Sequence, residues 1–211
     1  MQVMPCTPQR TFALSAQDAV FLDFDGTLAH LQDDAKSVCL ADGMALVLEA
    51  CANRLSGALA IISGRDADDL AKRVPQAIWR FGNHGLRALA PGEHSGNRIA
   101  AAPKDLIDTF SNIANRHPGV HVEPKGPVLA VHYRAAPSVE SALGTALRQV
   151  IDAFPDYSLQ HGKMVYEAKP AAANKGACLL KAIQTEPFAG RRPVMIGDDT
   201  TDEDAFIAAQ S

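Results

Sequence analysis

The fold is decided by the stretch AVFLDFDGTL, residues 19–28, in which an apolar run ends in two aspartates one residue apart. A short, continuous apolar run bounded by turn residues is typical of a strand that is buried on both faces. Similar runs occur at 58–62, 77–81 and 193–196, and segments with helical periodicity lie between them. This alternation predicts an α/β protein with a Rossmann-like, doubly wound parallel sheet as its core.

The pattern changes in the middle of the chain. Helices are expected at about 104–116 and 138–154, and two segments, 120–125 and 128–134, alternate apolar and polar residues around the turn Gly126-Pro127. Alternation of this kind is typical of antiparallel strands with one covered face. We therefore expect an α+β cap domain inserted into the core. Its predicted limits are 87–164, with the core formed by 1–86 and 165–211.

Composition restricts the classes of partner. The 211 residues carry a formal net charge of -4 and contain no block of like charges, which argues against nucleic acid and anionic membranes as partners. The four cysteines form no CxxC pair, and neither a signal peptide nor an apolar segment of membrane-spanning length is evident. These features predict a cytoplasmic protein with free thiols, expected to be a monomer.

Asp23 and Asp25 are the first candidates for chemistry. Residues two apart on an extended chain project to the same side, so the two carboxylates repel each other unless a cation or a proton lies between them. A simpler reading is that one of them caps the following turn through a bond to Gly26 or Thr27. The pair alone does not decide between these readings.

A second acidic cluster favours a metal site. GDDTTDED, residues 197–204, follows another predicted strand, so Asp198 and Asp202 are expected near Asp23 at the same edge of the sheet. Oxygen ligands gathered from two strand ends suit Mg²⁺. Thr200 and Glu203 have the spacing of a capping box, which predicts that Glu203 and Asp204 serve the following helix instead.

Two further segments offer donors to a phosphate. Ser63-Gly64-Arg65 opens a helix directly after a strand, and exposes a hydroxyl and backbone amides. Lys175 begins another helix, where a cation is unfavourable unless it faces a carboxylate or a phosphate. Together with the aspartates, these groups fit phosphoryl transfer through an aspartyl phosphate.

At this point the chain resembles a known family. DFDGT (23–27), ISGR (62–65), Lys175-Gly176 and GDDTTDED (197–204) resemble, in order, the four motifs of the haloacid dehalogenase-like aspartyl phosphatases. Further segments are similar to those of the trehalose-6-phosphate phosphatases within that superfamily. They are NHG at 83–85, EPKG at 123–126, HYR at 132–134 and YEAKP at 166–170. The resemblance covers the chain from about residue 18 to its end.

The resemblance implies a role for each matched residue of the core. Asp23 would be the nucleophile, and Asp25 would protonate the leaving sugar oxygen and later activate water. Mg²⁺ would bind Asp23, the backbone carbonyl of Asp25 and Asp198, with Asp202 as a further ligand or support. Ser63 and Lys175 would hold the phosphoryl oxygens.

The resemblance also implies which residues bind the substrate, a small sugar phosphate. Glu123, Lys125 and Glu167 match positions of the cap that contact the sugar. Arg134 and Lys169 lie in matching motifs and are added to the same set, as are Gly64 and Arg65 beside the phosphate. Arg65 could instead pair with a nearby acid of the protein. The implied reaction is Mg²⁺-dependent hydrolysis of trehalose 6-phosphate to trehalose and phosphate.

Two alternatives stay open. The four core motifs address only the phosphate, so a capped phosphatase for another sugar phosphate, such as sucrose phosphate, fits them as well. A non-catalytic domain that senses a sugar phosphate is the second alternative. Members of the family extend beyond the position that corresponds to Ser211, so a truncated core with reduced stability is also expected.

Overall fold

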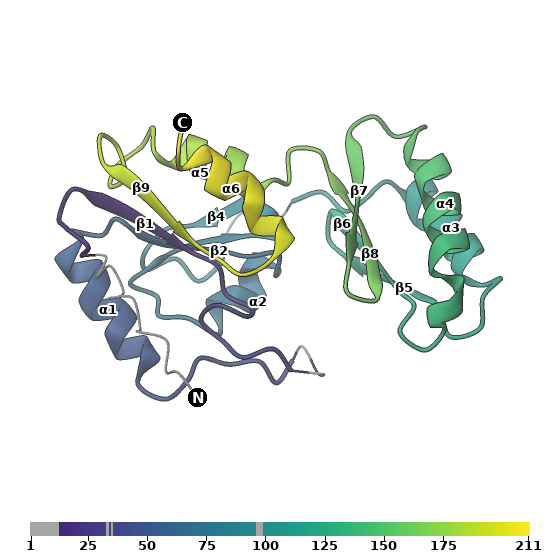
Figure 1. The fold of residues 1–211 in the computed structure, drawn as a ribbon, viewed down its shortest axis with the longest axis horizontal. Coiled ribbons are helices and arrows are strands. Elements are labelled where there is room, and N and C mark those ends of the chain that lie inside the picture. The colour runs from purple at the N-terminus through teal and green to yellow at the C-terminus, as the bar shows by residue number, and fades with distance from the viewer. Residues whose placement is uncertain (1–12, 33, 35, 96–98) are drawn as a thin grey trace, which may run out of the picture.

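The computed structural model of the chain has two lobes, each built on its own sheet (Figure 1). The structure describes residues 13–32, 34, 36–95 and 99–211. The five-stranded sheet of the first lobe has the order β4-β3-β2-β1-β9. Its strands are β4 (Arg87–Leu89), β3 (Trp79–Gly82), β2 (Leu59–Ile62), β1 (Asp18–Leu22) and β9 (Arg192–Ile196).

This sheet is parallel except at one edge. β1 pairs in parallel with β2 and β9, and β2 with β3, whereas β4 runs antiparallel to β3. Helices α1 (Met44–Arg54) and α2 (Ala67–Ala71) lie on one face, and α5 (Lys175–Ala182) and α6 (Glu203–Ala208) lie on the other (Figure 1). The predicted doubly wound α/β core is therefore confirmed.

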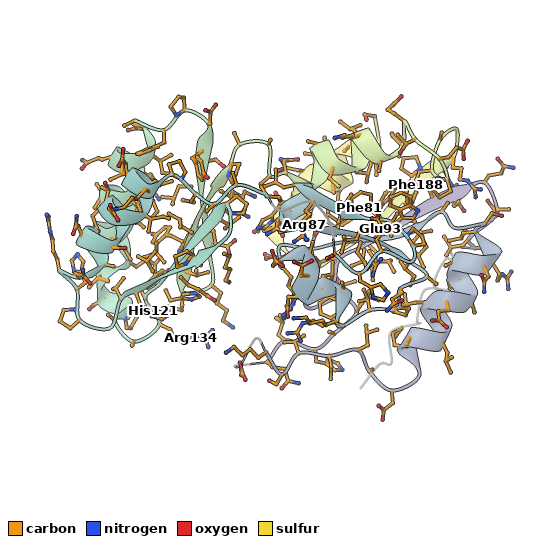
Figure 2. All side chains as sticks on the ribbon, turned by 180° about the vertical axis from the view of Figure 1, so that it is seen from behind. Phe81, Arg87, Glu93, His121, Arg134 and Phe188 are labelled. Carbon is orange, nitrogen blue, oxygen red and sulfur yellow. The ribbon has the colours of Figure 1, made fainter. Side chains whose placement is uncertain are left out.

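An aromatic cluster joins the sheet to its helical layer. The ring of Phe188 lies 5.1 Å from that of Phe21, 5.9 Å from Trp79 and 6.4 Å from Phe81. Phe81 and Phe188 lie together inside the first lobe (Figure 2). Burial of large rings supplies much of the free energy of folding of such a core, so this cluster holds β1 and β3 in place.

The second lobe is an antiparallel sheet of four strands in the order β5-β6-β8-β7. The strands are β5 (His121–Lys125), β6 (Val128–His132), β8 (Val165–Pro170) and β7 (Tyr157–Gly162). Helices α3 (Lys104–Ala114) and α4 (Glu140–Ile151) cover the face that points away from the first lobe (Figure 1). The alternation predicted for 120–125 and 128–134 therefore corresponds to a hairpin with one covered face.

The two sheets divide the chain differently from the predicted boundaries. Arg87–Leu89 pairs with β3 in the first sheet, and Val165–Pro170 pairs with β6 and β7 in the second. Strand pairing crosses the boundaries at 86/87 and 164/165, because β4 and β8 follow tight turns back onto their neighbours. We propose that the inserted domain begins after β4 and ends with β8.

Several helices are shorter than their apolar periodicity suggests. The helix predicted at 104–116 ends at Ala114, and the one at 138–154 is a 3₁₀ turn, Pro137–Val139, followed by α4. Phe154, beyond the end of α4, still packs on the core, so the apolar periodicity continues past that helix. Among the described residues, no helix is both long and apolar enough to cross a membrane. Cys39, Cys51 and Cys178 are free, and Cys6 lies outside the described residues.

Asp18 at the start of β1 supplies a test of how the sheet is held. Its carboxylate is buried and accepts hydrogen bonds from Arg192 Nε and from the Ser15 amide, each at 2.7 Å. The hydrogen bond from Arg192, followed by that from Ser15, lowers the pKa of Asp18 to about 2. A carboxylate with a depressed pKa stabilises the fold above its unfolded pKa of about 3.9 and loses this effect as the pH falls toward 2.

We therefore expect Asp18→Asn to lower the free energy of unfolding near neutral pH, and to do so less and less as the pH falls below about 4. Urea denaturation of both proteins across this range measures the difference. A deficit that stays constant down to about pH 2 would show that the ion pair is not its source.

Candidate active site

The site lies where three strands of the first sheet end. Asp23 directly follows β1, and its amide donates to the carbonyl of Ile196 at the end of β9 (2.9 Å). Ser63 follows β2, and its amide donates to Phe81 of β3 (2.9 Å). Carboxyl ends of parallel strands are the usual place for ligands in doubly wound sheets. The strand order therefore brings side chains from distant parts of the chain to one edge.

A buried lysine connects two aspartates of the site, Asp23 and Asp202. Lys175 Nζ lies 2.6 Å from Asp23 Oδ1 and 2.6 Å from Asp202 Oδ1, and the three side chains are 3%, 6% and 0% exposed. Lys175 is the first residue of α5, where a cation opposes the helix dipole. The two carboxylates offset this cost, and Asn174 caps the helix through the amide of Ala177 (2.8 Å).

Burial and the ammonium act in opposite directions on Asp23. Burial raises the pKa of Asp23 to about 6, although Lys175 works to lower it. Burial works to lower the pKa of Lys175, but Asp23 and Asp202 outweigh it and hold that pKa above its usual range. Lys175 is therefore charged, and further positive charge at the site would favour the ionised form of Asp23.

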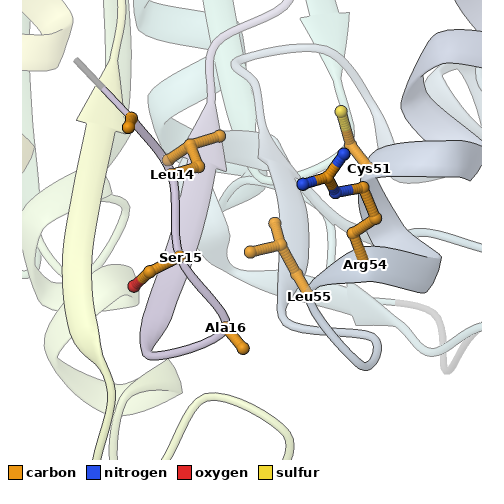
Figure 3. Close-up of a pocket in the computed structure, with 7 residues that line it drawn as sticks. Leu14, Ser15, Ala16, Cys51, Arg54 and Leu55 are labelled. Carbon is orange, nitrogen blue, oxygen red and sulfur yellow. The ribbon is translucent and has the colours of Figure 1, made fainter.

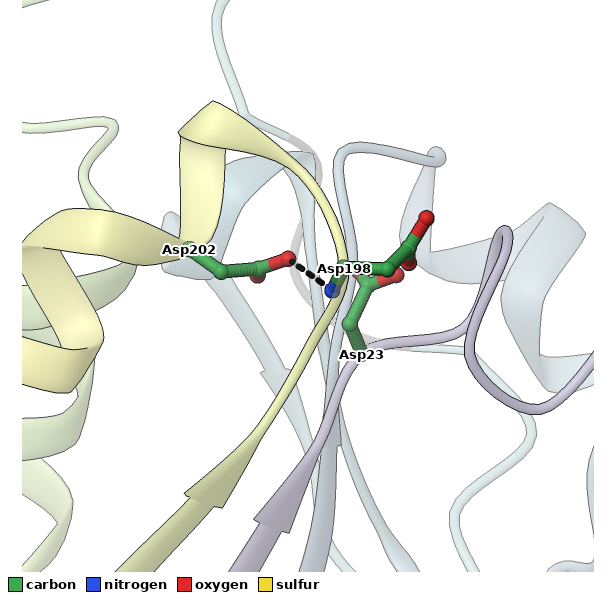
Figure 4. Close-up of side chains that lie close together, drawn as sticks. All are labelled: Asp23, Asp198 and Asp202. Atoms are coloured by element: carbon green, nitrogen blue, oxygen red, sulfur yellow. Dashed lines mark hydrogen bonds between the residues drawn. The ribbon is translucent and has the colours of Figure 1, made fainter. Parts of the chain in front are cut away.

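Three carboxylates lie close enough to share a cation. Oxygens of Asp23, Asp198 and Asp202 lie within 4.8 Å of one another (Figure 4). Asp198 is exposed and accepts a hydrogen bond from the hydroxyl of Thr27 (2.8 Å). Gly26, at φ +92°, makes this approach possible, because a Cβ there would lie 2.1 Å from Asp198 Oδ2.

The three oxygen donors are not equally available. Asp202 already uses both carboxylate oxygens, one for Lys175 and the other for the amides of Asp198 and Asp199 at 3.2 Å (Figure 4). Asp23 and Asp198 are thus the better ligands for a hard cation such as Mg²⁺, and Asp202 is better placed as support for the loop.

The predicted capping box of Thr200 and Glu203 is wrong by one position. The box is formed by Asp199 and Asp202 around the 3₁₀ turn Thr200–Asp202 that precedes α6. The turn begins earlier than the sequence suggests, because Asp202 is drawn inward by Lys175 and caps the turn at the same time. Glu203 and Asp204 lie in the first turn of α6, where negative charge is favourable.

Asp25 is held by an arginine. Arg65 Nε lies 3.0 and 2.8 Å from the two oxygens of Asp25, and Nη2 lies 2.5 Å from one of them. Arg65 also donates to Asp69 at 3.1 Å and lies over the ring of Phe24. Arg65 therefore pairs with acids of the protein, although the sequence assigns it to the substrate.

The loop after β2 has the groups of an anion site. Ser63 is buried, and its Oγ accepts a hydrogen bond from the Arg65 amide at 3.1 Å. Gly64 leaves room for the ring of His84, since a Cβ would lie 2.7 Å from Cε1 of that ring. The loop is thus fixed from two sides and opens toward Asp23.

A cavity of about 610 Å³ extends from this loop to the open face of the second sheet. Its volume suits a ligand of disaccharide size. Residues of both lobes line it: Asp23, Asp25, Asp34, Lys36, Ser63, Gly64, Arg65, Asp66, Asp69, Arg73, His84, Glu123, Lys125, His132, Glu167, Lys175, Asp199 and Thr201.

Most of the predicted substrate-binding residues line this cavity, but two do not. Arg134 is exposed and lies at the lower rim of the second lobe near His121 (Figure 2), and Lys169 lies half-buried on β8. Arg134 belongs to the segment predicted as a strand at 128–134, but β6 ends at His132 and the chain turns before Arg134 can continue the strand.

The cavity also contains residues that the sequence did not single out. Asp69 lies in α2, and Arg73 follows the end of that helix. The guanidinium of Arg73 donates two hydrogen bonds to the carboxylate of Asp69, which also binds Arg65. The spacing of four residues from Arg65 to Asp69 and from Asp69 to Arg73 could have indicated this group, because side chains four apart on a helix are neighbours. His132, which the sequence did mark as part of the HYR segment, also lines the cavity. Its Nε2 lies 2.9 Å from Oε2 of Glu123, and Nζ of Lys125 lies 3.4 Å from the same oxygen.

A second cavity lies at the other end of the sheet. It has a volume of about 590 Å³ and is lined by Ala13, Leu14, Ser15, Ala16, Cys51, Arg54 and Leu55 (Figure 3). Arg54 is its only charged lining residue within the described parts of the chain. A cavity without a carboxylate or a hydroxyl beside a base offers no machinery for phosphoryl transfer.

Comparison with known proteins adds independent information. Residues 21–211 match the family model described as Trehalose-phosphatase. The chain is 38% identical over 198 residues to the trehalose-6-phosphate phosphatase of Escherichia coli, which covers 92% of this chain and 74% of that protein. It is 36% identical over 191 residues to a probable trehalose-phosphate phosphatase of Sinorhizobium fredii, covering 89% and 72%.

Solved structures share the fold. The C-terminal domain of the trehalose-6-phosphate phosphatase of Candida albicans superposes with a TM-score of 0.75 at 24% identity, over 92% of this chain and 73% of that one. A haloacid dehalogenase-like hydrolase of Bacteroides thetaiotaomicron gives a TM-score of 0.66 at 12% identity, over 90% and 84%. At these identities the likeness concerns the fold.

The buried lysine should dominate the stability of this edge of the sheet. Lys175→Met leaves Asp23 and Asp202 buried without their cation, and removal of one partner from a buried pair costs about 3–5 kcal/mol. We expect a loss of that size in the free energy of unfolding, measured by urea denaturation with EDTA present.

Two controls separate this effect from a general weakness of α5. Lys181→Met removes an exposed lysine from the same helix and should change stability by less than about 0.5 kcal/mol. Lys175→Met combined with Asp202→Asn should recover part of the loss, because one uncompensated carboxylate is gone. A double variant as unstable as the single one would contradict the assignment.

Proposed function

Because the chain belongs to the trehalose-phosphatase family, we propose that it hydrolyses trehalose 6-phosphate to trehalose and phosphate. It is a phosphoric monoester hydrolase of the haloacid dehalogenase-like superfamily. The observation that carries the proposal is that one cavity is lined both by Asp23 and Lys175 and by the polar face of the second sheet. One end offers phosphoryl chemistry, and the other offers hydrogen bonds to sugar hydroxyls.

In the proposed reaction, a carboxylate oxygen of Asp23 attacks phosphorus and the bond from phosphorus to the sugar oxygen breaks. Asp25 gives its proton to that oxygen, so trehalose leaves and an aspartyl phosphate remains. Asp25 then takes a proton from water, which attacks phosphorus and releases phosphate with Asp23 restored. Lys175 next to Asp23 reduces the repulsion between the nucleophile and the substrate dianion.

The loop at the end of β2 is the proposed seat of the phosphoryl group. The hydroxyl of Ser63 and the backbone at Gly64 lie in the same cavity as Lys175. These groups offer donors from two sides of the phosphorus atom, which keeps it in line with Asp23.

Asp23 and Asp198 are the residues that we propose to hold Mg²⁺, with the backbone carbonyl of Asp25, and Asp202 supports them. When bound, Mg²⁺ would neutralise phosphoryl charge and favour the ionised form of Asp23. The donor set fits a hard cation, because it contains carboxylate and carbonyl oxygens and no sulfur.

The proposed reaction requires that the ion pair between Arg65 and Asp25 breaks. Both carboxylate oxygens of Asp25 accept hydrogen bonds from the guanidinium, so this contact competes with the approach of the leaving sugar oxygen. Asp69 gives Arg65 an alternative partner, so the guanidinium can turn away when the substrate enters. We therefore propose that Arg65 holds the carboxylate of Asp25 in place in the free enzyme, and that it contacts the substrate once the substrate has bound.

The second sheet supplies the proposed sugar site. Glu123, Lys125 and Glu167 line the cavity from β5 and β8 and offer both acceptors and donors to hydroxyls. Arg134 and Lys169 stay weaker proposals, because neither lines the cavity. We also propose that the protein acts in the cytoplasm as a monomer, in accord with its free cysteines and modest net charge.

The substrate is tested by phosphate release from trehalose 6-phosphate, sucrose 6-phosphate and glucose 6-phosphate, each with Mg²⁺ and with EDTA. We expect the highest kcat/KM for the first, by at least about tenfold, and loss of activity with EDTA that Mg²⁺ restores. A preference for sucrose 6-phosphate would favour the alternative sugar phosphate. Binding of any of them without turnover would favour a sensor.

Asp25→Asn tests the proposed acid and base. Loss of general acid–base catalysis should lower kcat for trehalose 6-phosphate by about 10²–10⁴. With p-nitrophenyl phosphate, whose leaving group needs no proton, the variant should release a rapid burst of about one nitrophenol per enzyme and then turn over slowly. Asp69→Asn is the matched control, since it removes a second acid that binds Arg65. Equal losses in the two variants would argue against a special role for Asp25.

A further inference from the structure

The turn that follows β3 has an unusual backbone. Asn83, His84 and Gly85 have φ values of +53°, +56° and +91°, so three consecutive residues are left-handed and two of them are not glycine. A residue with a side chain is strained in this region and stays there only where the surroundings enforce it. The reason for keeping His84 here must lie in what its side chain does.

The surroundings of the turn belong to the phosphate loop. The His84 amide donates to the carbonyl of Ser63 at 2.9 Å, and the Asn83 amide donates to that of Arg65 at 2.7 Å. The side chain of Asn83 accepts a hydrogen bond from the Ala67 amide at 3.2 Å. The turn is thus bonded along the whole of Ser63-Gly64-Arg65, and a shift of either segment would move the other.

The ring of His84 continues this connection toward the second lobe. The ring is 4% exposed and packs on Gly64, and its Nε2 lies 3.5 Å from Oε2 of Glu167 on β8. Nδ1 is buried and has no hydrogen-bond partner. Within the described parts of the chain, Glu167 is therefore the polar group that the ring faces.

The charges of the two groups fit a neutral donor and an ionised acceptor. Burial holds the pKa of His84 below its usual range, although Glu167 works to raise it. Burial works to raise the pKa of Glu167, but His84 outweighs it, with Lys125 and Lys169 helping, and the pKa lies below its usual range. A neutral imidazole carries one proton, and the nitrogen that faces a carboxylate is the one that holds it. Contacts of this kind are often long without a ligand and shorten when substrate binds.

We propose that His84 is a positioning residue that sets the distance between Glu167 in the sugar site and the Ser63-Gly64 loop in the phosphate site. This rests on the proposed function, because it gives both sites their ligands. In this role His84 acts through Glu167 and the Ser63-Gly64 loop and not on the reacting atoms. His84 makes the enzyme selective for substrates whose sugar and phosphate are separated by the distance that the ring fixes. The residue has little effect on a phosphate ester that carries no sugar.

Two amide substitutions distinguish this role from simple support of the turn. His84→Gln places an amide nitrogen near the position of Nε2, whereas His84→Asn tolerates the left-handed backbone but is too short to reach Glu167. A hydrogen bond to a charged group accounts for a roughly tenfold effect. We expect His84→Asn to lower kcat/KM for trehalose 6-phosphate by about tenfold, mainly through KM, and to lower that for p-nitrophenyl phosphate by less than about threefold. His84→Gln should restore most of the loss.

His84→Gly is the control for misfolding, because it removes the ring and glycine adopts this left-handed backbone without strain. It should show the same selective loss with a melting temperature at least as high as that of His84→Asn. A double-mutant cycle with Glu167→Gln should be non-additive, since the second change removes the group that His84 positions.

The proposal would be overturned by equal losses on the two substrates, by additive effects in the cycle, or by a wild-type substrate ratio in His84→Gly. Failure of the proposed function has a different signature. In that event the wild-type enzyme itself would show no preference for trehalose 6-phosphate over the other sugar phosphates, whatever the His84 variants do.

Discussion

The structure depends on one buried ammonium, that of Lys175, which holds the carboxylates of Asp23 and Asp202 at 2.6 Å each. Ion pairs taken out of water are costly, and replacement by apolar residues is often no worse for stability. A chain that keeps such a group at the edge of its sheet gains something other than stability. The ammonium brings the end of β1, the start of α5 and the turn before α6 to one point, which places the proposed nucleophile, Asp23, at the wall of the cavity.

The same interaction explains why the site calls for a divalent cation. Asp23, Asp198 and Asp202 together carry more negative charge than Lys175 neutralises, and a phosphate ester adds further negative charge. Burial pushes the pKa of Asp23 up to about 6, so added positive charge is needed to keep it reliably ionised. The sheet fixes the positions of the acids, and Gly26 allows Asp198 to come close. The proposed cofactor and the proposed nucleophile are thus consequences of one arrangement.

Patterns that repeat along the chain could be predicted from the sequence, but contacts that depend on tertiary distance could not. Apolar runs located β1, β2, β3 and β9, and the rule that ligands bind beyond the carboxyl ends of parallel strands indicated that the polar residues after them lie together. The contact of Lys175 with an acidic partner could be expected, because a lysine at the start of a helix is electrostatically unfavourable unless it faces a carboxylate or a phosphate. In contrast, the bond of Arg65 to Asp25 joins residues 40 positions apart, and neither segment indicates which acid Arg65 meets. The left-handed backbone of His84 and the inward turn of Asp202 depend on neighbours in the same way.

The most direct test of the central claim is to trap the covalent intermediate. Enzyme turning over trehalose 6-phosphate with Mg²⁺ is quenched and treated with borohydride, which reduces an acyl phosphate to an alcohol, and the modified residue is located by peptide mass spectrometry. The arrangement around Lys175 predicts that Asp23 alone is reduced. Reduction at Asp25 or Asp198, or turnover with no reduced residue, would contradict it.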